Sequence, residues 1–206
     1  LDLACGQGVF SRFLLEKKIN PEGLDSSEEL LRMARSRSIK LIPYHLGNAG
    51  DAKVLNGQEF DGIACLLAVQ NIEKIEPVFQ NVARWLKPKG KFVMVLTHPC
   101  FRIPRQTHWG WDEDKKIEYR RVDRYANEMK IPILTPPFVD KVNYTMTYHR
   151  PLQNYFSALL KAGLYVDCLE EWMSNKESAS GKRSRGENRA RKEVPLFMAI
   201  RAVRSS

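Results

Sequence analysis

The first eight residues, LDLACGQG, constrain this chain more than any other stretch, because they have the pattern of a buried strand that ends in a glycine turn. Gly6 and Gly8 flank the turn, and glycine both adopts positive φ and lets a ligand approach the backbone. Apolar residues then recur with a helical period from Val9 to Lys18. A strand, a glycine turn and a helix in this order predict a helix N-terminus that points at a ligand, as in the cofactor crevice of an open α/β sheet.

Two kinds of cofactor fit such a turn. A dinucleotide fold favours the pattern GxGxxG, but the third glycine position here is Ser11. Asp2 suits a ligand with an ammonium and a sulfonium better than it suits a pyrophosphate. The stretch from Asp2 to Gly8 resembles motif I (acidic-x-Gly-x-Gly-x-Gly) of the class I S-adenosylmethionine-dependent methyltransferases, with Ala4 in place of the first glycine. The resemblance implies S-adenosylmethionine as the cofactor.

A second acidic residue follows the glycine turn by about 20 positions, where a carboxylate can accept both ribose hydroxyls of an adenosine-containing cofactor. Asp25 ends a short predicted strand, and Ser26 or Ser27 can cap the helix predicted from Glu28 to Arg37. The segment GLDSSEELLRMA also resembles the second motif of the family.

The next two predicted strands, from Ile39 to Leu46 and from Gly62 to Val69, end near further candidate residues. Where the family often has Gly-Asp-Ala beside the adenine, this chain has Gly47-Asn48-Ala49, so Asn48 and the nearby Asp51 are competing candidates for the adenine contact. The cofactor-binding residues that the resemblance implies are Asp2, Ala4, Gly6, Gly8, Asp25, Ser26, Asn48, Ala49 and Leu66.

Alternating strands and helices predict a parallel sheet with right-handed crossovers. The later predicted elements are a helix from Pro77 to Leu86, a strand from Lys91 to Leu96, a helix from Pro151 to Ala162, a strand from Leu164 to Leu169 and a strand from Pro195 to Val203. They resemble the end of the family's doubly wound, mostly parallel, Rossmann-like seven-stranded sheet with its antiparallel last strand. At 206 residues the chain is expected to be a single α/β domain (1–206), truncated at its N-terminus because it lacks an initiating Met.

Residues of about 101–148 fall outside this pattern and predict a small antiparallel β insertion after the fifth core strand. Stretches 115–125 and 139–148 alternate with a period of two, and the prolines between them separate two strands. Loops at the carboxyl ends of parallel strands build the site, so residues 97–111 and the insertion are expected to form the wall and lid of an acceptor pocket.

The candidate acceptor residues lie within or next to this region. Arg102, Trp109 and Trp111 are the predicted substrate-binding residues, because guanidinium groups hold carboxylate or phosphate and indoles line apolar pockets. His98 is the candidate catalytic base, because its ordinary pKa lies near neutrality. The alternative for His98 is a strand-end histidine bonded to the backbone. Arg150 is a second candidate for an anion, and His149 reads as a structural residue before a helix.

The charge of the chain raises other possible functions. The formal net charge is +9, and seven basic side chains fall within 176–192, inside a predicted solvated loop of about 174–193. An RNA or protein methyltransferase could use such a surface. However, Gln70-Asn71-Ile72-Glu73 stands where exocyclic-amine enzymes have Asp/Asn-Pro-Pro-aromatic, and Cys100 lies in no recognised cytosine-methyltransferase context. A nicotinamide-dependent oxidoreductase and a non-catalytic member of the fold are the remaining alternatives.

Composition sets the expected surroundings. No apolar run approaches the roughly 18 residues that a membrane span needs, and the four cysteines show neither metal-ligand nor disulfide spacing. The sequence thus predicts a soluble, cytoplasmic enzyme without a metal, although a targeting signal could precede Leu1. We expect a small-molecule methyl acceptor, with oxygen, nitrogen and carbon all open as the acceptor atom, and an undetermined oligomeric state.

Overall fold

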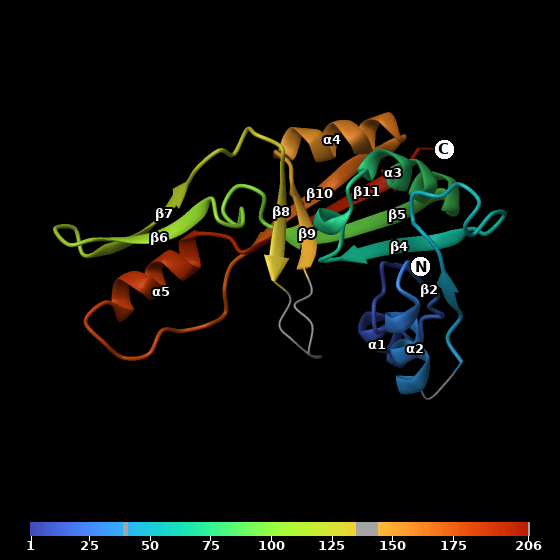
Figure 1. The fold of residues 1–206 in the computed structure, drawn as a ribbon, viewed down its shortest axis with the longest axis horizontal. Coiled ribbons are helices and arrows are strands. Elements are labelled where there is room, and N and C mark those ends of the chain that lie inside the picture. Colours follow the sequence, from blue (N-terminus) through green and yellow to red (C-terminus); the bar gives the residue numbers. More distant parts are fainter. Residues whose placement is uncertain (39–40, 135–143, 206) are drawn as a thin grey trace.

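The computed structural model describes residues 1–38, 41–134 and 144–205. Seven strands form one sheet in the order β10-β11-β5-β4-β1-β2-β3 (Figure 1). Their bounds are Asp2–Leu3 (β1), Gly23–Asp25 (β2), Tyr44–Leu46 (β3), Phe60–Leu66 (β4), Leu86–Thr97 (β5), Leu164–Trp172 (β10) and Phe197–Arg204 (β11). Strands β1 to β5 are parallel to one another, whereas β11 is antiparallel to both β5 and β10. The predicted sheet with its antiparallel last strand is confirmed.

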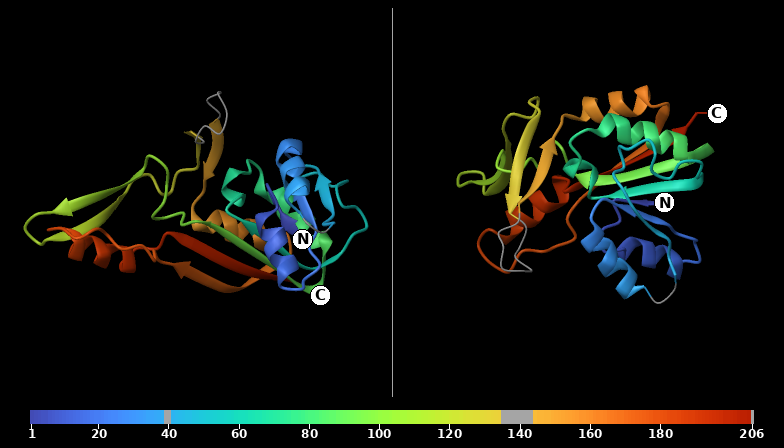
Figure 2. Two further views of the ribbon diagram at one scale, coloured as in Figure 1. Left: turned by 90° about the horizontal axis from the view of Figure 1, so that it is seen from below. Right: turned by 45° about the vertical axis from the view of Figure 1, so that its right-hand side comes forward.

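Helices cover both faces of this sheet, as a doubly wound fold requires. Helices α3 and α4 lie on one side, and α1 and α2 lie on the other side near β2 (Figures 1 and 2). The bounds are Val9–Glu16 (α1), Glu28–Arg37 (α2), Ile75–Trp85 (α3) and Leu152–Lys161 (α4), with a short 3₁₀ turn at Val69–Asn71 (η1). Each predicted core helix is therefore present.

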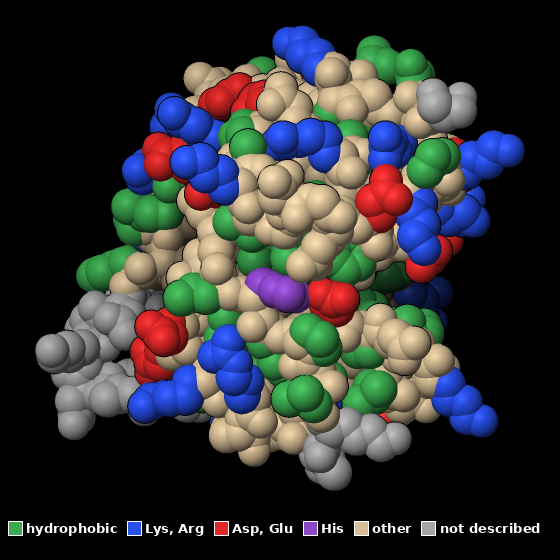
Figure 3. Space-filling model, turned by 90° about the vertical axis from the view of Figure 1, so that its right-hand side faces the viewer, with side chains coloured by type: hydrophobic (Ala, Val, Ile, Leu, Met, Phe, Trp, Pro, Cys, Tyr) green, Lys and Arg blue, Asp and Glu red, His purple; other side chains and the backbone are tan. Residues whose placement is uncertain are grey.

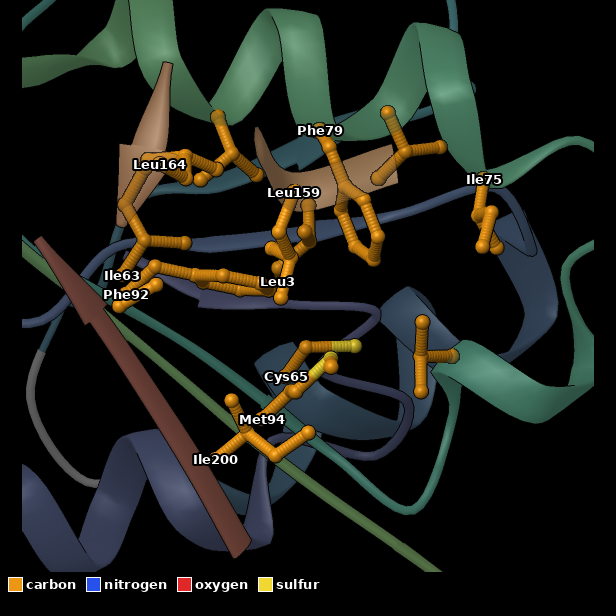
Figure 4. Packing of buried hydrophobic residues seen from close by; sticks show 14 of the residues in the cluster. Leu3, Ile63, Cys65, Ile75, Phe79, Phe92, Met94, Leu159, Leu164 and Ile200 are labelled. Atoms are coloured by element: carbon orange, nitrogen blue, oxygen red, sulfur yellow. The ribbon is translucent and has the colours of Figure 1, made fainter. Parts of the chain in front are cut away.

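The largest core cluster lies between the sheet and the helices α3 and α4. Phe79 of α3 and Leu159 of α4 are fully buried against the sheet residues Ile63 and Phe92 (Figure 4). The rings of Phe79 and Phe92 lie 5.8 Å apart. Burying side chains of this size stabilises a fold by roughly 1.5–3 kcal/mol each, so this cluster holds the helices α3 and α4 against the sheet.

Helix α2 has the capping that its sequence predicts. Of the two candidate serines, Ser27 is the N-cap, and its side chain accepts a hydrogen bond from the Leu30 amide at 3.3 Å. Glu28 and Glu29 in the first turn, with arginines in the last turn, complement the helix dipole. The helix therefore starts directly after the end of β2.

The third strand is shorter than predicted. The expected strand from Ile39 to Leu46 is a strand only over Tyr44–Leu46, while residues 39–40 lie outside the described part. Leu41 is exposed, and Tyr44 packs on α2 in a separate small cluster with Leu31 and Ala34. All three residues of β3, which is an edge strand of the sheet, pair with β2.

The predicted antiparallel β insertion is present, and it consists of two strand pairs. Strand β6 (Thr107–Asp112) pairs with β7 (Ile117–Val122), and β8 (Met129–Leu134) pairs with β9 (Tyr144–His149). Stretches 115–125 and 139–148 are therefore not partners, and residues 139–143 lie outside the described part. Each stretch pairs instead with its neighbour in sequence, because closing a shorter loop costs less entropy. Pro132 lies within β8, as proline can in a strand that has a partner on one side only.

The basic segment also differs from the prediction, which was a loop of about 174–193. Residues Ser184–Glu193 form helix α5, which packs against β7 at the end of the molecule away from the core helices (Figures 1 and 2). Gly186 and Ala190 are buried four positions apart on one helix face, while the charged side chains face outward. Two small residues are enough to bring α5 close to the β6–β7 hairpin, so the helix packs there without a large apolar residue.

Among the described residues, no helix has both the length and the apolarity that crossing a bilayer requires.

Candidate cofactor and acceptor site

The turn after β1 adopts the left-handed backbone conformation at three alternate positions. Ala4, Gly6 and Gly8 have φ values of 57°, 52° and 68°. A Cβ on Gly6 would meet no described atom within 4 Å, so the space above this residue is open. A Cβ on Gly8 would instead collide with the ring and hydroxyl of Tyr44. Gly8 is therefore required by the packing of β3, whereas Gly6 leaves room for a ligand.

Asp25 joins the end of β2 to this turn. Its carboxylate accepts hydrogen bonds from the backbone amides of Gly6 and Ser27, both at 2.8 Å. Asp25 is 9% exposed, and Ser26 beside it is exposed. A carboxylate has about four acceptor positions, so two backbone bonds leave acceptor capacity for hydroxyl groups of a ligand.

Asp2 places a second carboxylate beneath the same turn. It is 2% exposed, and the buried Ser11 hydroxyl donates to its Oδ2 at 2.6 Å. Burial raises the pKa of Asp2 to about 6, although the hydrogen bond from Ser11 acts in the opposite direction. Ser11, which occupies the third glycine position of a dinucleotide motif, thus binds the Asp2 carboxylate by a hydrogen bond. A buried carboxylate of this kind is stabilised by a nearby cation.

The ends of β3 and β4 complete the edge of the sheet around the turn. Asn48 is exposed and its Oδ1 accepts from the Gly50 amide at 2.8 Å, while Asp51 is exposed and accepts from the Lys53 amide at 2.9 Å. Each of the two candidates for the adenine contact thus accepts a hydrogen bond from a backbone amide in the same loop. Ala49 is half-buried and accepts a hydrogen bond from Asn81, and Leu66 is half-buried at the end of β4.

A cavity of about 520 Å³ lies at the carboxyl ends of β4 and β5. Its walls come from η1, the end of β5, the segment before β6, and strands β7, β8 and β9. Arg102 of the predicted acceptor residues lines it, together with Gln70, Thr97, Arg105, Arg120 and Thr147. The expected position of the pocket, between the fifth core strand and the insertion, agrees with this cavity.

His98 does not lie in this cavity. The side chain is 2% exposed, its Nε2 lies 2.7 Å from Oε1 of Glu171, and its Nδ1 accepts from the amides of Cys100 and Phe101 at 3.2 and 3.4 Å. Since Nδ1 accepts, Nε2 carries the hydrogen that it donates to Glu171. Both ring nitrogens are thus used in holding the chain after β5, so the geometry opposes the role of catalytic base and favours the structural alternative.

The two predicted indoles also lie outside the residues that line the cavity. The guanidinium of Arg120 lies 4.8 Å from the ring of Trp109, directly across the β6–β7 pair. Trp111 packs against Gly186 of α5 and lies 5.2 Å beneath the guanidinium of Arg183. Trp111 therefore joins α5 to the hairpin, and Trp109 supports Arg120.

Arg150 and His149 are buried by backbone contacts. Arg150 donates to the carbonyls of Ile72 and Glu73, and Nε2 of His149 bonds to the Tyr125 carbonyl at 2.9 Å. Burial lowers the pKa of His149 below its ordinary value, which favours the neutral ring. Arg150 thus ties η1 to β9 instead of offering its guanidinium to an anion, and His149 has the structural role that was expected.

Residue patterns alone did not indicate that Arg120 and Gln70 line the cavity. Arg120 falls in the alternating stretch 115–125, where the pairing of β6 with β7 turns it toward the cavity. Its neighbour Arg121, on the opposite face, does not line the cavity and pairs with Asp123 instead. The alternation with a period of two indicated that 115–125 is a strand with two different faces. Which face of β7 points toward the cavity depended on its pairing with β6.

Comparison with known proteins agrees with this arrangement. The model of a methyltransferase domain family matches residues 1–94, from β1 into β5. A ubiquinone biosynthesis O-methyltransferase from Hydrogenovibrio crunogenus is 29% identical over 93 residues, which are 44% of this chain and 39% of that protein. A demethylmenaquinone methyltransferase from Symbiobacterium thermophilum is 33% identical over 102 residues, 45% of this chain and 40% of that protein. The chain thus spans about two fifths of the length of these relatives.

Solved structures match over almost the whole chain. An S-adenosylmethionine-dependent methyltransferase from Mesorhizobium loti has a TM-score of 0.73 and 27% identity, over 98% of this chain and 89% of that one. A second structure, from Listeria monocytogenes, has a TM-score of 0.72 and 24% identity, over 100% and 90% of the two chains, and supports the fold. The chain therefore has the Rossmann-like fold of the class I S-adenosylmethionine-dependent methyltransferases, and its residues 1–94 match the model of a methyltransferase domain family.

Proposed function

We propose that this protein binds S-adenosylmethionine over the turn after β1 and transfers its methyl group to a small molecule held in the cavity beside β4 and β5. The observation that carries the proposal is the 2.8 Å hydrogen bond from the Gly6 amide to Asp25. This bond places the acidic end of β2 against the open space above Gly6, as a ligand with ribose hydroxyls requires.

The residues around the turn divide the recognition of the cofactor between them. Asp25 accepts the ribose hydroxyls with the acceptor capacity that the amides of Gly6 and Ser27 leave. Asp2 attracts the positively charged methionine part, because a cation offsets the cost of its buried negative charge. Ala4, Gly8 and Ser26 shape the turn and its surroundings, and Asn48, Ala49 and Leu66 border the adenine.

The reaction asks the protein mainly for positioning. When bound, S-adenosylmethionine supplies a methyl group on a sulfonium, which an acceptor atom displaces in line. The described residues that line this cavity include no Asp, Glu, Cys or His, so no side chain there accepts a proton readily at neutral pH. We therefore assign the cavity the tasks of orienting the acceptor and excluding water.

The relatives support the cofactor more than the acceptor. The matching family model covers residues 1–94, which include the glycine turn and Asp25 but none of the insertion. The name of the Hydrogenovibrio relative, an O-methyltransferase, favours oxygen as the first acceptor atom to test. Nitrogen and carbon are the next acceptor atoms to test, because most residues that line the cavity lie beyond residues 1–94, which the family model matches.

The test compares two variants by calorimetry with S-adenosylhomocysteine. Asp25→Asn keeps the shape of the side chain but removes its charge, and we expect affinity to fall by roughly 1.5–3 kcal/mol, the range of a charged hydrogen bond. Asp112→Asn is the matched control, because Asp112 also accepts from two backbone amides, at 3.0 and 2.9 Å, in the β6–β7 turn. Its affinity should be that of the original protein.

The same titration separates the alternative functions. Binding of NAD or NADP in place of S-adenosylhomocysteine would favour an oxidoreductase. An affinity for S-adenosylhomocysteine that Asp25→Asn leaves unchanged, with thermal unfolding also unchanged, would remove Asp25 from the site.

A further inference from the structure

The cavity beside β4 and β5 contains positive charge without a described negative charge. Arg102, Arg105 and Arg120 line it, and no Asp or Glu does so among the described residues. Surface arginines normally pair with carboxylates or point into solvent, as Arg121 does on the opposite face of β7, where it bonds to Asp123 at 2.9 Å. Arg102 and Arg105 are exposed and Arg120 is half-buried, yet all three line one cavity without a described carboxylate, which calls for a separate explanation.

Arg120 is held in a fixed position with part of its hydrogen-bonding capacity unused. Its Nε donates to the Phe101 carbonyl at 2.9 Å, and its Nη2 donates to the Thr107 hydroxyl at 2.5 Å. Trp109 supports the guanidinium from one side at 4.8 Å. Since a guanidinium has five N–H donors, three remain for a ligand. Such a group is already ordered, so binding through it costs little side-chain entropy.

Arg102 brings a second charge close to the first. Its guanidinium makes no hydrogen bond or ion pair with another side chain in the described part of the chain. Burial, with a smaller contribution from the nearby charge of Arg102, lowers the pKa of Arg120 below its ordinary value. The two like charges repel each other, and an anion between them would turn this repulsion into attraction. Arginine pairs bind carboxylate and phosphate in this way, often through two parallel hydrogen bonds each.

Gln70 adds a polar group at another wall of the same cavity. Its Nε2 donates to the Leu67 carbonyl at 2.8 Å, which fixes the amide orientation, and its buried Oε1 has no hydrogen-bond partner among the described residues. Gln70 follows β4, which lies between β5 and β1 in the sheet, so it lies at the same carboxyl edge as the glycine turn that follows β1. A ligand hydroxyl or amine that donates to this oxygen would face the cofactor.

We infer that the methyl acceptor carries an oxyanion, a carboxylate or a phosphate, which Arg102 and Arg120 bind, while the group to be methylated lies toward Gln70. This inference rests on the proposed function for the direction of the ligand, but anion binding itself does not depend on the cofactor. It narrows the acceptor to small molecules with a negative group at one end and a hydroxyl or amine at the other.

The experiment measures binding of three probes by calorimetry in the presence of S-adenosylhomocysteine. The probes are 3-hydroxybenzoate, 3-hydroxyphenyl phosphate and the uncharged 3-hydroxybenzamide. We expect at least one anionic probe to bind about tenfold or more tightly than the amide, as charge-assisted hydrogen bonds predict. The stronger of the two anions identifies which oxyanion the cavity prefers.

Variants then place the anion. Arg102→Gln should remove most of the preference for the anion, and Arg121→Gln, with the same loss of charge one residue from Arg120 on the opposite face, should keep it. Arg120→Gln should behave like Arg102→Gln if the hairpin stays folded, which the unfolding temperature checks. Equal binding of the anions and the amide, no binding of any probe, or the same effect in Arg102→Gln and Arg121→Gln would each overturn the inference.

The outcome also separates this inference from the proposed function. Binding of S-adenosylhomocysteine without any preference for the anions would leave the methyltransferase and remove the anionic acceptor. A preference for the anions that depends on Arg102, in a protein that does not bind S-adenosylhomocysteine, would leave the anion site and remove the proposed cofactor.

Discussion

Ala4 is the residue of the cofactor turn that departs most clearly from the family motif. It replaces a glycine, yet the structure keeps it in the left-handed conformation at φ 57°. For an L-residue with a Cβ this conformation costs roughly 1–2 kcal/mol relative to the right-handed region. The turn is therefore maintained by its surroundings, including the bond from the Cys5 amide to the Leu24 carbonyl at 3.1 Å.

Ala4→Gly should accordingly stabilise the protein by about 0.5–1 kcal/mol, because relief of the left-handed strain exceeds the extra entropy of glycine in the unfolded chain. Urea unfolding measures this change. Ala162→Gly is the control, because Ala162 has an ordinary φ of −83° at the end of α4, and this variant should lose stability instead. A loss of stability in Ala4→Gly as well would show that the turn is relaxed.

Asp2 makes the stability of the cofactor-free protein depend on pH. Its pKa is about 6 in the folded protein against an ordinary value of 3.8, so the folded state binds more protons between these values. Stability therefore falls as the pH rises from about 4 to about 6, by roughly 3 kcal/mol in total. Above this window the cost of the buried charge is fully present, and below it the cost is absent.

Asp2→Asn should remove this part of the pH dependence and raise the free energy of unfolding at pH 7, while weakening S-adenosylhomocysteine binding. Urea unfolding across the window, with and without ligand, measures both effects. Asp61→Asn is the control, since the Asp61 carboxylate is exposed and paired with Lys87. The same slope in Asp2→Asn and in the original protein would assign the pH dependence to another group.

Helix α5 could not be predicted from the composition of its segment, which is mostly polar and charged. Its ten residues include charged side chains that gain little from burial, and the Arg189–Glu193 pair at 2.8 Å lies on its surface. Its attachment depends on the close approach at Gly186, where a Cβ would lie 2.7 Å from the Trp111 ring and 3.0 Å from the Lys116 carbonyl. A helix held by so narrow a contact is sensitive to the size of one residue.

Gly186→Leu should separate α5 from the β6–β7 hairpin. We expect faster amide hydrogen exchange over 184–193, with S-adenosylhomocysteine affinity unchanged, because the cofactor turn lies in another part of the molecule (Figure 1). Arg185→Leu changes the neighbouring exposed position and should keep exchange slow. If exchange in Gly186→Leu also stays slow, Trp111 is not the main attachment of α5.

At the scale of the whole molecule, the +9 charge does not form one continuous surface on every face. On the face in Figure 3, acidic side chains lie among the Lys and Arg side chains. Ion pairs such as Arg183–Glu113 at 2.9 Å also offset part of the charge around α5. Interspersed charges of this kind favour weak, general attraction to anions over a specific nucleic-acid surface.

We therefore expect weak binding to DNA and RNA that falls steeply with added salt and shows no sequence preference. Fluorescence anisotropy with unrelated duplexes and hairpins at two salt concentrations measures it. Tight binding to one RNA that persists at high salt would instead favour the RNA methyltransferase alternative.

Much of the architecture could be predicted from local patterns. The glycine turn, the Ser27 cap, the apolar runs of β4 and β5 and the order of helices and strands each depend on residues close in sequence. For the same reason Asp2, Gly6 and Asp25 were predicted correctly as neighbours of one turn, since the ends of adjacent parallel strands meet at one edge. Their roles toward the cofactor remain predictions.

The features that were missed depend on contacts between distant residues. His98 is held by Glu171, 73 positions away, and Arg150 by carbonyls near Ile72, so neither spacing nor residue type could reveal that these side chains are already used. The pairing of β6 with β7 turned Arg120 toward the cavity, and Gly186 became a helix contact only because Trp111 lies opposite. Sequence patterns describe which conformations a segment favours. The partners of a side chain are set by the packing of the whole chain, because burial and hydrogen bonding are satisfied only once distant segments meet.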